Sequence, residues 1–75
     1  MPRLPRITGP ELVRALKKMG FVEHRQKGSH LTLKHLDTGR RVVVPIHVGK
    51  TLALGTLKAI LKQAGISVEE LKANL

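Results

Sequence analysis

One histidine of this chain stands just past a glycine turn, in a basic stretch. The stretch runs from Arg25 to Lys34 and reads R-Q-K-G-S-H-L-T-L-K. The alternation after the glycine predicts a β-strand, whose period of two residues places His30, Thr32 and Lys34 on one face. Because imidazole titrates near neutral pH, a histidine presented beside cations could act as acid or base on a phosphodiester.

Three cations flank this histidine in the sequence, namely Arg25, Lys27 and Lys34. Cleavage of RNA requires a base that deprotonates the ribose 2′-hydroxyl and groups that stabilise the negative charge developing on the phosphate. His30 is the candidate base, and the three cations are candidates to neutralise phosphates. The simpler interpretation is a surface histidine on a solvated basic face, and the local pattern allows both.

A second candidate histidine, His47, follows Pro45 in a predicted loop. There it could supply the acid that complements His30, contact a substrate, or have no role.

Ser29 directly precedes His30, but adjacent residues of a strand point to opposite faces, so a serine nucleophile activated by His30 is disfavoured. Ser29 is therefore a secondary candidate for substrate contact.

The sequence offers no familiar metal or cofactor site. It contains no cysteine, which excludes disulfides and thiolate zinc ligands, and none of its four histidines forms an i, i+4 pair. It also lacks a glycine-rich phosphate-binding loop, and its five acidic residues form no obvious metal-binding pair. We therefore expect neither a metal nor a cofactor.

Length and charge narrow the class of protein. The chain has 75 residues, which predicts one domain, residues 1–75, with a small core built from aliphatic side chains. Fourteen Lys and Arg against five Asp and Glu give a formal net charge of +9. Such a charge attracts polyanions, so nucleic acid is the leading class of partner and an acidic protein is the alternative.

The amino-terminal residues predict no export signal. Residues 1–6 contain two prolines and no apolar signal-peptide core, and no later run reaches the roughly 20 apolar residues that cross a bilayer. We expect a cytoplasmic protein without a membrane partner, whose first six residues are flexible.

Local signals predict a helix followed by three strands. Thr8 and Glu11 have the spacing of a capping box, and the apolar residues that follow at helical intervals carry this helix to Gly20. The expected strands cover residues 21–26, 29–35 and 40–44. A turn at residues 27–28 joins the first two, and Pro45 ends the third.

The second half of the chain predicts two more helices. One is amphipathic and ends at Gly65, and the capping box Ser67 to Glu70 begins a short closing helix through Leu71. The order α-β-β-β-α-α indicates an α+β fold with helices packed on one face of a three-stranded antiparallel sheet. The residues expected on the open face are His30, Thr32, Lys34 and Arg41. This set suits contact with a sugar-phosphate backbone.

Five segments carry a resemblance to a known family. They are residues 9–12, 20–21, 25–30, 44–47 and 55–66, which read G-P-E-L, G-F, R-Q-K-G-S-H, V-P-I-H and G-T-L-K-A-I-L-K-Q-A-G-I. In this arrangement the chain resembles the HicA family of bacterial toxins, the messenger-RNA interferases of HicAB toxin-antitoxin pairs. The resemblance spans almost the whole chain, and its central and last segments are the most specific.

The resemblance implies a fold similar to double-stranded-RNA-binding domains. It also implies endoribonuclease activity on messenger RNA that inhibits translation, with His30 as the essential catalytic residue. A cognate HicB-type antitoxin is implied as a partner that covers the active surface, and the positive charge would steer this association.

Two other classes of function are alternatives. One is a non-catalytic RNA-binding domain of the same fold, in which His30 contacts a sugar or a base and the RNA stays intact. The other is a DNA-binding regulator that reads a groove with its first helix, which the lack of a clear helix-turn-helix pair disfavours.

Overall fold

The first helix begins where the sequence supplies both halves of a capping box. In the computed structural model, which describes residues 3–75, helix α1 (Gly9–Lys18) follows Thr8, whose hydroxyl accepts a hydrogen bond from the Glu11 backbone N–H at 3.3 Å. The Glu11 carboxylate accepts one in return from the Thr8 backbone N–H at 2.9 Å. These bonds satisfy N–H groups that a helix start otherwise leaves unpaired, and the predicted start of α1 is confirmed.

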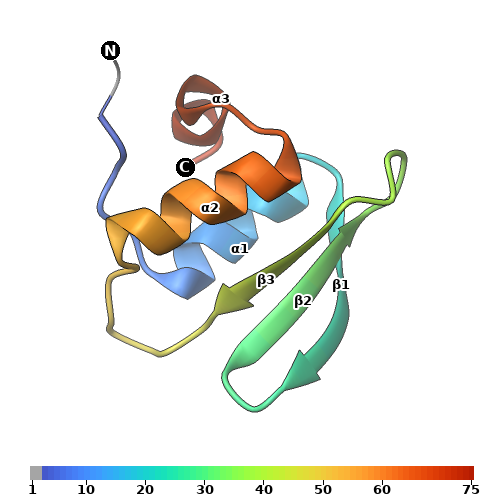
Figure 1. Cartoon of the computed structure of the whole chain (residues 1–75), viewed down its shortest axis with the longest axis horizontal. Coiled ribbons are helices and arrows are strands. Elements are labelled where there is room, and N and C mark those ends of the chain that lie inside the picture. Colours follow the sequence, from blue (N-terminus) through green and yellow to red (C-terminus); the bar gives the residue numbers. More distant parts are fainter. Residues whose placement is uncertain (1–2) are drawn as a thin grey trace.

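Three strands follow α1 and form an antiparallel meander in the order β1-β2-β3 (Figure 1). Their bounds are β1 (Phe21–Lys27), β2 (His30–His35) and β3 (Arg41–Pro45). On β2 the inward side chains Leu31 and Leu33 are buried, whereas His30 is exposed. The predicted alternation of this strand is therefore confirmed.

Four predicted strand limits are wrong by one residue: β1 ends at Lys27 instead of residue 26, β2 begins at His30 instead of residue 29, and β3 covers residues 41–45 instead of 40–44. The hairpin turn is Gly28–Ser29 instead of residues 27–28, because Gly28 has a φ of +58° and a glycine takes the first turn position when that position needs a positive φ. Pro45 belongs to β3 and does not stop it at residue 44. β3 is an edge strand, where a residue without an N–H is tolerated.

The second helix ends and the closing helix begins at the predicted signals, but the closing helix runs two residues past the predicted Leu71, to Ala73. No local signal predicted the start of the second helix, whose N-cap residue Ala53 makes no side-chain hydrogen bond to the helix. Helix α2 (Leu54–Ala64) ends at Gly65, whose φ of +72° gives a left-handed cap. Helix α3 (Val68–Ala73) begins at the second capping box, formed by Ser67 and Glu70. The predicted α+β order of helix, three strands and two helices is confirmed.

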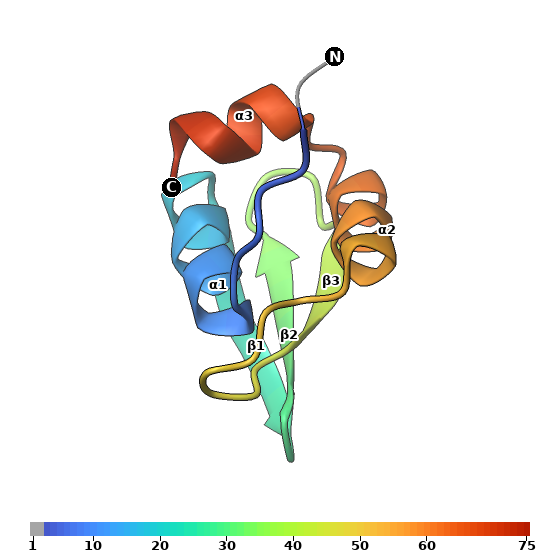
Figure 2. The same cartoon turned by 90° about the vertical axis from the view of Figure 1, so that its left-hand side faces the viewer.

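The helices α1 and α2 lie on one face of the sheet, and α3 lies across one end of this helical layer (Figure 2). The core between sheet and helices is aliphatic apart from Phe21. Its most deeply buried side chains are Leu12, Leu16, Leu33, Leu57, Leu71, Val42 and Val44. In residues 3–75 no polar or charged residue is buried, so apolar packing holds the layers together.

The amino-terminal segment runs over the helical layer between α1 and α2 (Figure 2). Leu4 packs against the core, and the Leu52 backbone N–H donates to the Ile7 carbonyl at 2.8 Å. Met1 and Pro2, part of the segment expected to be flexible, lie outside the described residues. None of the helices in the described chain is long and apolar enough to span a membrane.

Gly9, the first residue of α1, lies directly against the end of β3. A Cβ atom at Gly9 would overlap the carbonyl oxygen of Pro45 and lie 3.0 Å from the Cα of Ile46. Both obstacles are backbone atoms, which cannot rotate away as a side chain can. The contact therefore requires glycine for space, and it fixes the start of α1 relative to the sheet.

We expect Gly9→Ala to lower the free energy of unfolding by about 1–3 kcal/mol, because the added methyl forces the helix away from β3. Gly55→Ala is the matched control, since Gly55 is also helical and a Cβ atom there would meet no other part of the chain within 4 Å. That control should be neutral or stabilise the fold by up to about 1 kcal/mol. Urea denaturation measures both, and equal effects would contradict the proposed close contact.

Candidate functional site on the open sheet face

The sheet face that α1 and α2 leave uncovered, here called the open face, carries its side chains in rows across the strands. Each row takes one residue from each strand. Starting at the hairpin turn, the rows are Lys27, His30 and Pro45, then Arg25, Thr32 and Val43, then Val22, Lys34 and Arg41. Directly paired residues have Cβ atoms about 5 Å apart, so the members of one row can act on the same chemical group.

An irregularity at His24 decides which cations of β1 reach the open face. Glu23 is paired with Leu33, on the helical side, but Arg25 is paired with Thr32, on the open side, so one extra residue lies between them. Without this bulge, simple alternation would put Arg25 and Lys27 on the face of Glu23. The bulge thus brings two cations beside His30, and no local sequence signal predicts it.

The open face is positively charged and lacks acidic side chains. Its cations are Arg25, Lys27, Lys34 and Arg41. The five acidic residues lie elsewhere, with Glu11 on α1, Glu23 on the helical side of β1, Asp37 in the turn after β2, and Glu69 and Glu70 on α3. Glu23 forms an ion pair with Lys17 of α1. A polyanion can therefore approach the open face without meeting a carboxylate on it.

His30 occupies the first position of the central strand, between Lys27 and Pro45. The side chain is exposed, and no hydrogen bond joins its ring to any residue within 3–75. Both ring nitrogens are thus left without a partner in residues 3–75. Lys27 is the cationic residue paired directly with His30 and is also exposed.

Ser29 and His47 meet beside the hairpin turn. The Ser29 hydroxyl lies 3.4 Å from His47 Nε2, and the Ile46 backbone N–H donates to the Ser29 carbonyl at 2.8 Å. His47 comes two residues after Pro45, the cross-strand neighbour of His30. The fold therefore brings the second candidate histidine to the same end of the sheet as His30, with Ser29 as its contact.

His35 is held by the fold, in contrast to His30. Its Nδ1 accepts hydrogen bonds from the backbone N–H groups of Asp37 and Thr38, both at 3.1 Å, and its Nε2 lies 3.0 Å from the Met19 carbonyl oxygen. This geometry assigns the proton to Nε2, which donates to that carbonyl. The ring also packs edge-on against Phe21, with centroids 4.9 Å apart.

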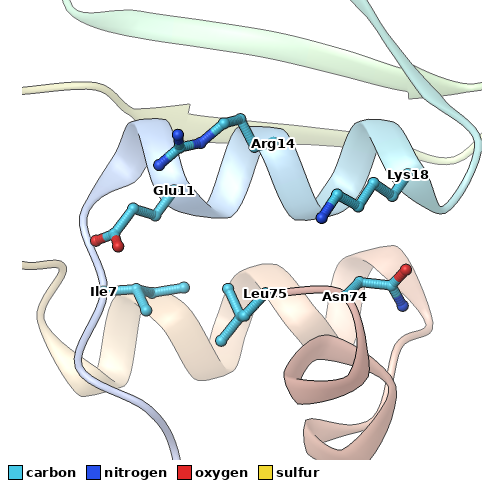
Figure 3. Close-up of a pocket in the computed structure, with 6 residues that line it drawn as sticks. All are labelled: Ile7, Glu11, Arg14, Lys18, Asn74 and Leu75. Atoms are coloured by element: carbon cyan, nitrogen blue, oxygen red, sulfur yellow. The ribbon is translucent and has the colours of Figure 1, made fainter.

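A hollow of about 380 Å³ lies between α1 and the carboxyl-terminal residues, away from the open face (Figure 3). The residues that line it are Ile7, Glu11, Arg14, Lys18, Asn74 and Leu75. None of them belongs to the sheet.

The hydrogen bonds that Glu11 accepts from the Thr8 backbone and hydroxyl lower the pKa of its carboxyl group, so this acid is ionised at neutral pH and serves the helix cap.

Residues 3–75 contain no group of three or more His, Asp or Glu side chains placed to hold a metal ion. The open face offers the chemistry of an imidazole and of side-chain cations. An exposed base beside cations can remove a proton from a hydroxyl while the cations neutralise a neighbouring phosphate.

Comparison with known families gives a match over most of the chain. A family model described as HicA toxin of bacterial toxin-antitoxin matches residues 9–66, which is more than half of the chain. The match extends from the first residue of α1 to just beyond the left-handed cap of α2, and it includes the whole open face. No curated protein matches the chain.

We expect His35→Ala to lower the free energy of unfolding by about 2–4 kcal/mol, because it removes three hydrogen bonds and the contact with Phe21. His30→Ala should change it by less than about 0.5 kcal/mol, since that ring is exposed. Thermal or urea unfolding of both variants measures the difference. A large destabilisation by His30→Ala would show that His30 has a structural role.

Proposed function

Because the chain belongs to the HicA toxin family of bacterial toxin-antitoxin systems, we propose that this toxin is an endoribonuclease that cleaves messenger RNA in the cytoplasm and so inhibits translation. One observation carries the proposal. His30 is an exposed histidine with a free ring, at the hairpin end of the central strand, on a face that holds four cations and no acidic side chain. That combination serves RNA phosphodiesters better than any other substrate class.

The proposed reaction begins with proton transfer to His30. In its neutral form the imidazole takes the proton of a ribose 2′-hydroxyl, and the 2′-oxygen then attacks the adjacent phosphorus. A 2′,3′-cyclic phosphate forms as the bond to the 5′-oxygen of the next nucleotide breaks, and that oxygen takes up a proton. Base and charge stabilisation both come from side chains, so the reaction requires no metal or other cofactor.

The neighbours of His30 have distinct proposed roles. Lys27, directly across β1, stabilises the charge on the scissile phosphate, while Arg25 and Lys34 bind the RNA backbone. His47 and Lys27 are the candidates for protonating the leaving oxygen, because both lie at the same end of the sheet as His30. Ser29 supports His47 through their contact at 3.4 Å.

A non-catalytic RNA-binding domain of the same fold is the rival function. It draws on one observation, that in residues 3–75 no acceptor orients the His30 ring, whereas catalytic histidines are commonly oriented by a third group. In that case His30 would contact a sugar or base without cleaving the strand. Formation of a cyclic-phosphate product separates the two functions.

We expect His30→Ala to lower the rate of RNA cleavage by about 10²- to 10⁴-fold, because a single acid-base group contributes about that much. The assay incubates purified protein with a defined messenger RNA in EDTA, with folding checked by circular dichroism. His24→Ala is the matched control, since His24 is another exposed histidine of the sheet. Equal cleavage by wild type and a well-folded His30→Ala protein would refute the assignment.

Membership of the family implies an antitoxin partner, and we propose a HicB-type protein that covers the open face. Attraction between a partner's acidic surface and the +9 chain should steer their encounter. We expect the association rate constant to fall at least about tenfold between roughly 0.05 and 0.5 M salt, as charges become screened. Stopped-flow or surface-binding kinetics measure this, and a rate independent of salt would contradict electrostatic steering.

A further inference from the structure

Two cations of the open face are placed directly opposite each other with nothing to neutralise them. Lys34 of β2 is paired with Arg41 of β3, at the end of the sheet far from the hairpin turn. Like charges in directly opposed positions destabilise a sheet. The ion pair found in residues 3–75 joins Lys17 to Glu23 on the helical side, so it relieves neither cation. The repulsion between Lys34 and Arg41 therefore lowers the stability of the sheet.

This pair is too far from His30 to share its phosphate. His30 and Lys34 are four residues apart on the same strand, which is about 13 Å at about 3.3 Å per residue. Between them lies Thr32, which adds a hydroxyl to the same face. A phosphate that His30 and Lys27 hold for cleavage therefore leaves Lys34 and Arg41 free to bind a different anionic group.

Apolar side chains lie beside the pair on the open face. Val22 shares the row of Lys34 and Arg41 and is 40 % exposed, and Val43 in the next row is 46 % exposed. A strand of RNA presents both kinds of group, charged phosphates and the flatter, less polar surfaces of riboses and unstacked bases. The alternation of cations with exposed valines matches this ligand, whereas an isolated small anion would need the cations alone.

We infer that Lys34 and Arg41 form a second phosphate-binding site, which holds the backbone of the RNA substrate at a nucleotide remote from the one that is cleaved. The inference rests on the proposed ribonuclease function and extends it. It makes the substrate a strand long enough to reach both ends of the open face. A dinucleotide without a terminal phosphate has only the phosphate that links its two nucleosides, which the reaction at His30 occupies, so it cannot use the second site.

The test compares two substrates, such a dinucleotide and a single-stranded RNA of about ten nucleotides, within the usual range of single-strand binding sites. The variant is Lys34→Gln combined with Arg41→Gln. Its matched control is Arg14→Gln combined with Lys18→Gln, which also removes one Arg and one Lys, but from α1 in the helical layer (Figure 2), where both residues line the hollow of Figure 3. The combined Lys34→Gln and Arg41→Gln variant should fold, because it removes the repulsion between these two cations. If it does not fold, Arg41→Gln alone replaces it in the test.

We expect the double substitution on the sheet to lower kcat/KM for the longer RNA about tenfold more than for the dinucleotide, as charge-assisted contacts to a phosphate are lost. The salt dependence of binding, as log Kd against log salt concentration, should become shallower by about 0.7 for each lost phosphate contact. The control variant should show neither effect. Equal losses on both substrates, or no loss on either, would overturn the second site.

Binding experiments keep this inference separate from the proposed catalysis. Fluorescence anisotropy of the longer RNA, measured in a His30→Ala background, reports binding without cleavage. If wild type binds but does not cleave, and the double substitution still weakens binding, the ribonuclease function fails while the second site stands. If the double substitution weakens capture of an acidic antitoxin peptide but not of RNA, the site belongs to a protein partner and the inference is refuted.

Discussion

The contact between Gly9 and the carbonyl of Pro45 sets the position of the helical layer on the sheet. Because Gly9 has no side chain, α1 starts against the backbone of β3, and the capping box at Thr8 fixes the helix at that point. Pro45 is also the cross-strand neighbour of His30. The same residue thus receives the helix on one side of the sheet and borders the candidate catalytic histidine on the other. Close backbone packing and the presentation of His30 depend on one short stretch of β3.

The cations of the open face repel one another, and this repulsion opposes folding. Four cations share a surface without an acidic residue, and two of them are directly opposed. Such an arrangement reduces stability through repulsion, so the aliphatic core and the two capping boxes must offset it. Local departures from what is best for stability are expected at functional sites. The bulge at His24 is another such departure, because it interrupts the hydrogen-bond ladder between β1 and β2 and turns Arg25 and Lys27 toward the open face.

The histidines show how environment separates chemical roles within one residue type. His35 is fixed by three backbone contacts and an aromatic neighbour, and its ring has no nitrogen left for a ligand. His47 touches Ser29 beside the hairpin turn, whereas His30 makes no hydrogen bond to the described chain. Proton transfer to a substrate requires a free nitrogen and access, and His30 satisfies both conditions. The sequence pattern predicted His30 and His47 as candidates, but it gave no sign of the hydrogen bonds that hold His35.

The amino-acid sequence by itself determined the elements of this protein. Capping boxes, glycine caps and periodic apolar residues act over a few neighbouring positions, which is why α1, the sheet strands and the alternation of His30 with Leu31 could be predicted. Only the tertiary structure decided which elements meet. The face of Arg25 depends on a bulge in strand pairing, the contact of Ser29 with His47 joins a turn to a distant loop, and the opposition of Lys34 and Arg41 depends on sheet register. These features arise from the exact register and contacts between separate strands and loops, and local sequence signals do not encode that register.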